Sequence, residues 1–231
     1  MNVKSKYTSN DPNILTAYES EVSGDYAAAI EHYKKALEAD PSLVIVYKHL
    51  GNVYYRLGMM NKAVESLKKA VEAMPDYPTA QFELGLAYFR QGLIGDGLKC
   101  MEQVIATDPD FTIARYWAGI MTYHLGKLHE SKKHFEIVTQ RSPEFAIAFF
   151  HLGVTNLRLG YFTEAIVALK ALLEKNPENP TAHSLLGEAY LNVEKRFEAR
   201  ECFRRALELD PDDQKAKKGL SIVVDDKESI I

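Results

Sequence analysis

Two histidines in the middle of the chain come close to a zinc-binding pattern. His129 and His134 stand five residues apart in the run HESKKH. Zinc peptidases place two histidines four residues apart on a helix, so that both rings lie on one face beside a glutamate that acts as general base. A spacing of five residues turns the second ring about 140° away from the first at 3.6 residues per turn. We therefore expect no metal centre here, and the sequence indicates no cofactor.

A glycine-rich run is the second near match to a chemical motif. Residues 92–99 read GLIGDGLK, which shares its glycine content with a phosphate-binding loop. That loop ends in Gly-Lys-Ser or Gly-Lys-Thr and follows a strand, whereas this run lacks the ending and follows a predicted helix. No Ser/His/Asp or Cys/His grouping has a supporting local sequence either. The sequence therefore predicts a protein that is not an enzyme.

The two cysteines are expected to be free thiols. Cys100 and Cys202 occupy equivalent places in two units of a repeating pattern, with about six packed helices between them at roughly 8–10 Å each. A disulfide needs Cα atoms within about 7 Å of each other. Two unpaired thiols fit a reducing compartment, and the start of the chain is polar with no long apolar run. These features predict a cytoplasmic protein without a membrane span.

The composition is that of a folded, soluble chain with no basic character. Of its 231 residues, 46% are hydrophobic and 26% are charged, and the formal net charge is −4. A nucleic-acid-binding domain usually carries a basic patch and a high isoelectric point. We therefore expect partners that are proteins or peptides, and no nucleic acid.

A proline recurs at a fixed interval along nearly the whole chain. A period of this size indicates a stack of structural repeats. Within the second unit, Tyr47, Leu50, Gly51 and Tyr54 share one helical face, and Gly58 follows as a helix stop. Each unit is therefore predicted to be a helical hairpin that must stack to bury its faces. The prolines stand 34 residues apart, at Pro41, Pro75, Pro109, Pro143, Pro177 and Pro211.

The period divides the chain into six units with a segment at each end. Residues 1–9 are a polar lead, and residues 214–231 are predicted to form a capping helix and an acidic tail. Glu194 stands where the sixth unit should have its turn glycine, so modest strain is expected there. The units cover residues 10–43, 44–77, 78–111, 112–145, 146–179 and 180–213.

The units resemble tetratricopeptide repeats. The 34-residue period, the Leu-Gly-x-x-Tyr core, the glycine after the first helix and the closing Asp-Pro carry the resemblance from about Asn10 to Asp213. The resemblance implies an all-α, right-handed solenoid. It also implies a non-enzymatic scaffold or adaptor that binds a segment of a partner protein. A self-assembling structural protein is the alternative.

In this family, the second, fifth, ninth and twelfth residues of each unit line a concave groove. Applied here, that rule predicts a groove that is apolar and aromatic in the middle units and more polar at its ends, as interaction surfaces often are. Packing between neighbouring first helices and self-association are the alternative roles of these side chains. The candidate groove residues are Lys48, Asn52, Tyr55, Phe82, Leu86, Phe89, Tyr116, Ile120, Tyr123, Phe150, Val154 and Leu157.

A ladder of basic residues accompanies the predicted groove. Its members are either a solvated edge or a rim that pairs with acidic residues flanking the bound segment. They recur every 34 residues as Arg56, Arg90, His124 and Arg158.

A carboxylate clamp is only partly present. Co-chaperones of the family hold a C-terminal carboxylate with Lys and Asn on one first helix, Asn on the next, and Lys and Arg on the third. Lys48 and Asn52 match the first pair, but Glu83, Ile113 and Trp117 stand where the other three are needed. A co-chaperone-like receptor for acidic C-terminal tails is therefore a second alternative, with an incomplete site.

Overall fold

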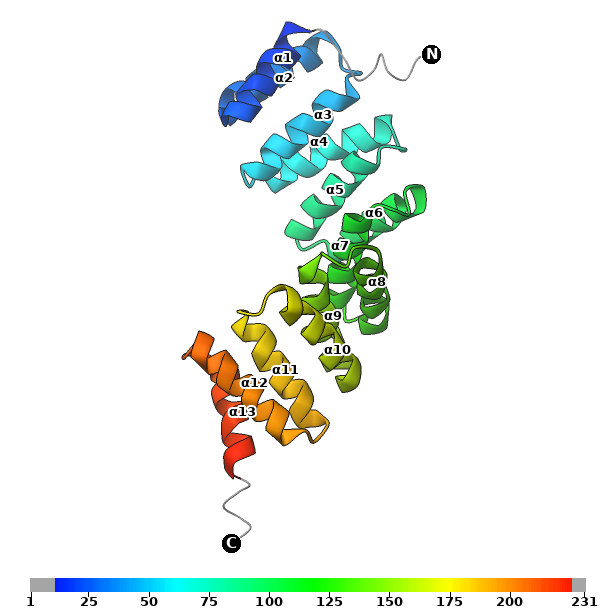
Figure 1. Ribbon diagram of the computed structural model, residues 1–231. Coiled ribbons are helices and arrows are strands. Elements are labelled where there is room, and N and C mark those ends of the chain that lie inside the picture. The colour runs from blue at the N-terminus through cyan, green and yellow to red at the C-terminus, as the bar shows by residue number, and fades with distance from the viewer. Residues whose placement is uncertain (1–10, 226–231) are drawn as a thin grey trace. The chain divides into compact units, whose positions relative to one another are not determined.

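The computed structural model describes residues 11–225, and in this range all regular secondary structure is helical (Figure 1). The predicted polar lead and the acidic tail beyond Asp225 lie outside the described residues. The helices are α1 (Pro12–Ser23), α2 (Tyr26–Ala39), α3 (Val44–Arg56), α4 (Met60–Ala73), α5 (Pro78–Arg90), α6 (Ile94–Thr107), α7 (Thr112–His124), α8 (Leu128–Arg141), α9 (Ala146–Leu159), α10 (Phe162–Lys175), α11 (Pro180–Asn192), α12 (Arg196–Leu209) and α13 (Gln214–Asp225).

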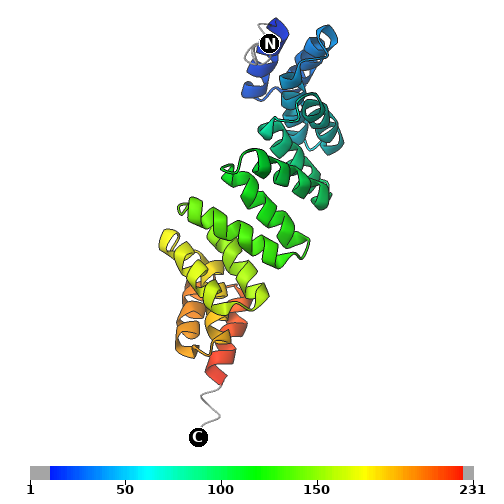
Figure 2. The same ribbon diagram turned by 90° about the vertical axis from the view of Figure 1, so that its right-hand side faces the viewer.

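The helices pair as hairpins, and the chain divides into two compact units. Unit 1 ends at Ala114 and contains α1 to α6. Unit 2 begins at Arg115, within α7, and contains α8 to α13. Inside each unit, the second helix of one hairpin also packs against the first helix of the next, as α4 does on α5 and α10 on α11 (Figure 2). The predicted all-α fold of hairpins with a last, unpaired helix is confirmed. No helix of residues 11–225 is long and apolar enough to cross a membrane.

The recurring proline lies two residues beyond the second helix of every hairpin. In three hairpins the aspartate before it ends the helix and binds the N–H two residues further on. Asp40 Oδ1 accepts from Ser42 N at 2.9 Å, and Asp210 Oδ1 accepts from Asp212 N at 3.0 Å. This Asx turn satisfies a backbone donor while the proline prevents the helix from continuing.

Each hairpin turns at a residue in the left-handed region. Five of these residues are glycines, among them Gly160 with φ +76°. The sixth is Glu194 with φ +59°, the one described non-glycine residue with positive φ. Side chains other than glycine adopt this conformation at a cost in stability. The predicted site of strain in the sixth repeat is therefore present in the backbone.

The glycine after the core leucine allows the two helices of a hairpin to approach closely. A Cβ on Gly153 would lie 2.7 Å from Leu169 Cγ, and one on Gly187 would lie 2.6 Å from Phe203 Cε1. Leu169 and Phe203 are fully buried. In the second to sixth hairpins, the core is thus a large side chain of the second helix set against the bare backbone of the first, whereas Ala17 takes the place of the glycine in the first hairpin.

The last helix, α13, repeats this arrangement at the C-terminal end. It packs on α11 and α12, with Ala216 and Val223 buried. A Cβ on Gly219 would lie 2.3 Å from Phe203 Cζ. Asp213 starts the helix by accepting a hydrogen bond from Ala216 N at 3.0 Å. α13 therefore covers the core of unit 2 as the predicted capping helix.

Candidate functional site

In unit 1, the candidate groove residues of α3 bind a carboxylate that comes from α5. Lys48 Nζ lies 3.2 Å from Glu83 Oε1, and Asn52 Nδ2 donates to the same oxygen at 3.0 Å. Burial raises the pKa of Glu83 and outweighs the opposite effects of Asn52 and Lys48. The two residues that match the co-chaperone clamp therefore already hold an internal carboxylate. An acidic C-terminal tail would have to displace Glu83 to bind these two residues.

The rim and the groove meet at Tyr55 and Arg90. The guanidinium carbon of Arg90 lies 5.0 Å from the centroid of the Tyr55 ring, which is cation–π geometry. Tyr55 and Phe89 are half-buried, and so is Phe82, whose ring lies 5.4 Å from that of Phe111. Leu86 is half-buried too. The apolar side chains of this face in unit 1 are thus partly accessible to solvent, and contacts with neighbouring side chains hold Tyr55 and Phe82 in place.

Unit 2 contains the same pairing, between its fourth and fifth repeats. The guanidinium carbon of Arg158 lies 4.7 Å from the centroid of the Tyr123 ring. Each of these arginines thus stacks on the twelfth residue of the preceding repeat. Within residues 11–225, neither Arg90 nor Arg158 makes a hydrogen bond or an ion pair. Their N–H groups are therefore held in place and available to a ligand.

The other two rim residues are placed differently. Arg56 donates to the hydroxyl of Tyr26 at 3.3 Å, and this contact raises the pKa of Arg56. The ring of His124 lies edge-on to its neighbour Tyr123, with 6.0 Å between the centroids. The ladder predicted as one feature is therefore two stacked arginines and two residues with other contacts.

Tyr116 is half-buried among other rings, and Ile120 is buried. The Tyr116 ring lies 5.0 Å from Phe145 and 5.9 Å from Phe135, between centroids. Burial raises the pKa of Tyr116. Ile120 is 9% exposed. Ile120 therefore serves mainly in packing, whereas Tyr116 is partly accessible, as Phe82 is.

Phe150 borders an open pocket in unit 2. It is half-buried, as are Val154 and Leu157, and all three pack on the core of the unit. Ile147, which also lines the pocket, is 42% exposed. The pocket has a volume of 390 Å³ and is lined by Ala146, Ile147, Phe150, Leu172, Asn176, Asn179 and Thr181. An apolar floor with side-chain amides at its edge suits an apolar side chain on a polar peptide backbone.

A further pocket, missed from the sequence, lies between α11 and α13. Lys215, Lys218 and Ile222 are the second, fifth and ninth residues of what would be a seventh unit, so the 34-residue count could have found them. Lys215 pairs with Glu188 at 2.8 Å. The pocket has a volume of 460 Å³ and is lined by Glu188, Leu191, Phe203, Gln214, Lys215, Lys218, Gly219 and Ile222.

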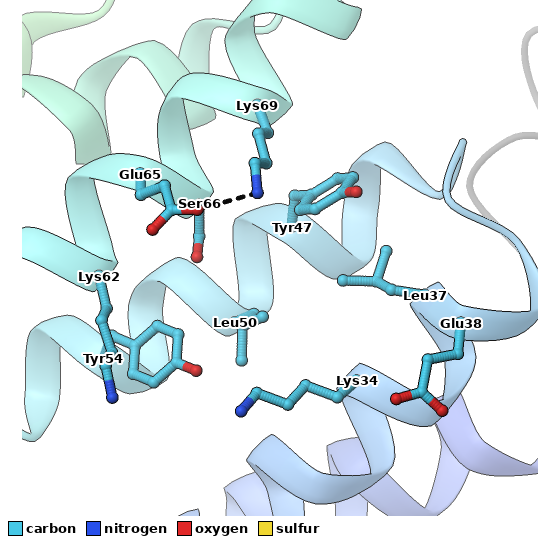
Figure 3. A pocket seen from close by; sticks show the side chains of 10 residues that line it. All are labelled: Lys34, Leu37, Glu38, Tyr47, Leu50, Tyr54, Lys62, Glu65, Ser66 and Lys69. Atoms are coloured by element: carbon cyan, nitrogen blue, oxygen red, sulfur yellow. Dashed lines mark hydrogen bonds and ion pairs between the residues drawn. The ribbon is translucent and has the colours of Figure 1, made fainter.

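The sequence also missed a pocket on another face of unit 1, between α2, α3 and α4 (Figure 3). Its apolar part includes Leu37 and Leu50, and its volume is 420 Å³. Lys62 Nζ lies 5.6 Å from the centroid of the Tyr54 ring, and Lys69 Nζ lies 5.7 Å from that of Tyr47. Two lysines thus lie over tyrosine rings in this pocket, and Glu38 and Glu65 line it as well.

Neither cysteine is bonded. Cys100 is buried and Cys202 is partly buried, and burial raises the pKa of each thiol to about 11. Such thiols are protonated and unreactive at neutral pH. In residues 11–225, no three potential metal ligands come together.

Sequence comparison agrees with this architecture. Models described as "TPR repeat" match residues 23–58 and 59–92, and models described as "Tetratricopeptide repeat" match residues 82–131, 123–180 and 156–221. The chain belongs to the tetratricopeptide repeat family. None of the curated proteins compared with it matches.

Similar solved structures share the same fold. YrrB, described as a tetratricopeptide repeat protein with an unusual peptide-binding site, is 21% identical with a TM-score of 0.77, over 84% of this chain and 100% of YrrB. A MamA structure is 29% identical with a TM-score of 0.68, over 70% of this chain and 94% of that one. MamA from Desulfovibrio magneticus RS-1, residues 41 to the end, is 20% identical with a TM-score of 0.69, over 74% and 97% of the two chains.

Proposed function

We propose that this protein is a non-enzymatic scaffold or adaptor that binds an extended or helical segment of a partner protein on its first-helix face. The segment would carry an apolar side chain for the pocket beside Phe150 and an acidic residue for the stacked arginines. The arrangement of Arg158 over Tyr123 carries this proposal, and Arg90 over Tyr55 repeats it in unit 1.

The chemistry of the stacked arginines favours a carboxylate ligand. A guanidinium presents its donors in a planar fork that matches a carboxylate. Stacking on tyrosine holds that fork in one orientation, so little conformational freedom is lost on binding. Because Arg158 makes no hydrogen bond or ion pair within residues 11–225, it can bind an acidic residue without breaking an internal contact.

Family membership supports protein binding as the general role. The peptide-binding site named for YrrB belongs to that protein, and at 21% identity the likeness supports only the fold. Peptide binding by the present chain is therefore proposed on its own residues. The apolar pocket of 390 Å³ is the anchor site that the proposal requires.

Peptide selection on the full-length protein tests the proposal. Twelve-residue peptides would be selected from a random display library, and their affinities measured by fluorescence anisotropy. We expect selected peptides to combine an apolar residue with Asp or Glu, and Arg158→Gln to weaken binding about tenfold, as loss of a charge-assisted hydrogen bond does. The melting temperature should change little, because an exposed cation–π contact is worth about 0.5–1 kcal/mol.

The control is Arg205→Gln, which removes the same charge from α12, where Arg205 pairs with Glu208 at 2.9 Å. It should leave peptide affinity unchanged. Equal losses in both variants would mean that only net charge matters. Selected peptides without acidic residues that bind Arg158→Gln as tightly as the wild type would contradict the acidic part of the proposal.

Self-assembly is a second candidate, favoured by one surface. Leu15, Tyr18 and Val22 on α1 lie on one helical face and are 55%, 53% and 71% exposed. An exposed apolar stripe is a typical contact surface. If copies associate through it, the mass from light scattering should rise with concentration and return to that of the monomer in Leu15→Gln/Val22→Gln. A constant monomer mass in the wild type would exclude self-assembly.

A further inference from the structure

Three of the six repeats share a pairing of tyrosine and lysine that the fourth and fifth repeats lack. The eleventh residue of the second, third and sixth repeats is a tyrosine, and a lysine stands 20 residues before it. In the third and sixth repeats this lysine lies 5.7 Å from the ring centroid, Lys68 over Tyr88 and Lys170 over Tyr190. In the fifth repeat, Asn156 replaces the tyrosine and Glu136 replaces the lysine. The fifth repeat thus has a smaller side chain in place of the tyrosine and a negative charge in place of the positive one.

The exchange leaves a pocket with a buried, unpaired amide. Asn156 is 2% exposed, and its Oδ1 atom has no hydrogen-bond partner. A buried acceptor without a donor is unfavourable and rare in folded proteins. The pocket lies between α8, α9 and α10 in unit 2 and has a volume of 300 Å³. It is lined by Glu136, Thr139, Gln140, Phe149, Leu152, Asn156, Glu164, Val167 and Ala168.

The walls of this pocket are apolar and the charged groups that line it are acidic, with Lys132 near both carboxylates and Lys175 Nζ 5.9 Å from the centroid of the Phe149 ring. Val167 is 65% exposed, and it stands beside Phe149 and Leu152. Glu136 accepts from Lys132 Nζ at 2.7 Å. Glu164 makes no hydrogen bond or direct ion pair within residues 11–225.

The equivalent pocket of unit 1 is lined by three lysines and two glutamates (Figure 3). There Lys34 and Lys62 occupy the places of Glu136 and Glu164, and Tyr54 occupies that of Asn156. In the picture, the Tyr54 ring and the Lys62 side chain lie side by side. The same fold position therefore has lysines in unit 1 at the two places where unit 2 has glutamates, and a tyrosine where unit 2 has Asn156.

We propose that the pocket at Asn156 binds an arginine side chain presented by a partner protein. The aliphatic stem would lie along Phe149, Leu152 and Val167, as long cationic side chains lie along apolar surface. The guanidinium has several donors in a rigid plane. One would meet the unpaired Oδ1 of Asn156 and others the carboxylates of Glu136 and Glu164. This site shares no residue with the candidate groove or its basic rim. It can therefore be tested independently of the peptide-binding proposal.

Titration with amino-acid amides tests the assignment directly. The full-length, ¹⁵N-labelled protein would be titrated with N-acetyl-arginine amide and followed by NMR. We expect shifts in α8, α9 and α10, including the side-chain amide of Asn156. The neutral isostere N-acetyl-citrulline amide should bind at least tenfold more weakly, because charge-assisted hydrogen bonds are the stronger ones. Equal binding by citrulline amide, norleucine amide or lysine amide would overturn the assignment to a guanidinium.

Two variants locate the site. Asn156→Tyr restores the side chain that other repeats have, so we expect a folded protein with an unchanged or higher melting temperature and at least tenfold weaker binding of the arginine amide. Glu164→Gln alters a single exposed side chain and should weaken binding about threefold even if the tyrosine variant does not fold. Glu38→Gln, at the equivalent pocket of unit 1, should have no effect. Unchanged affinity in Glu164→Gln and in folded Asn156→Tyr would refute the proposal.

Discussion

At the scale of single residues, one backbone conformation separates the sixth turn from the other five. Glu194 has φ +59° and an exposed side chain without a hydrogen bond or ion pair among residues 11–225. The side chain therefore brings strain and no compensating contact. The sequence alone locates this position, because the other five turns have glycine at the same place in the period.

Glu194→Gly should raise the free energy of unfolding by about 0.5–1 kcal/mol. The left-handed conformation costs a non-glycine residue about 1–2 kcal/mol, and the greater freedom of glycine in the unfolded chain returns part of that gain. Urea denaturation measures the difference. The reverse change, Gly160→Ala at φ +76°, should destabilise by about 1 kcal/mol. A less stable Glu194→Gly variant would show that the glutamate contributes a contact in solution.

The carboxylate of Glu83 gives a second prediction at this scale. Lys48 and Glu83 are 16% and 21% exposed in their side chains, and Asn52 binds the same oxygen. A double-mutant cycle with Lys48→Gln and Glu83→Gln should give a coupling energy of about 1 kcal/mol at pH 7, because the pair is half-buried and hydrogen-bonded. Additive effects of the two changes would mean that Lys48 points to solvent. The sequence placed Glu83 beside the partial clamp but could not show that it fills it, because that contact joins two repeats.

At the scale of helices, the sequence predicts ends and faces well and contacts between repeats poorly. Helix ends follow from local chemistry: Asp-Pro stops the second helix, and a left-handed residue ends the first. The stack of Arg158 on Tyr123 depends on how far one hairpin is shifted along the next, which no local pattern specifies. The same limit applies to Tyr116, which the count assigned to the groove. Its ring also lies 5.7 Å from that of His151 in the next repeat.

The packing of α9 on α8 should make stability depend on pH. His151 stacks on Phe135, with 5.5 Å between centroids and 17° between planes, and burial, helped by the charge of His124, lowers the pKa of His151. The unfolded chain then binds the proton more readily than the native state. The contribution of His151 is therefore complete above its unfolded pKa of about 6.5 and is lost as pH falls below it.

His151→Phe should flatten this dependence. The variant keeps a ring on Phe135 but cannot be protonated, so its free energy of unfolding should fall less than that of the wild type between about pH 7 and pH 5. Similar stability of the two proteins at pH 8 would show that the new ring fits. If the two stability curves run parallel down to pH 5, protonation of His151 does not weaken the native state.

At the scale of the whole molecule, the terminal helices α1 and α13 differ in how much of their apolar surface is exposed. α13 covers the core of unit 2 with Ala216 and Val223, while lysines occupy its polar side. α1 instead leaves Leu15 and Val22 exposed. A repeat array needs a polar outer face at each terminus to remain soluble as a monomer. The capping helix was predictable from its amphipathic pattern, whereas the exposed stripe was not, because a helical period does not tell whether a neighbour covers it.

Removal of residues 214–231 should therefore destabilise unit 2. The truncation uncovers Phe203, which is 1% exposed, and Ala206, which is fully buried. Loss of about two buried aliphatic side chains of α13 corresponds to roughly 2–4 kcal/mol. Hydrogen exchange should accelerate first in α11 and α12, the helices that α13 contacts, because repeats are stabilised mainly by their neighbours. Leu15→Gln/Val22→Gln at the other end should leave the stability of α1 nearly unchanged. Unaltered exchange in α11 and α12 after truncation would mean that α13 is not a cap.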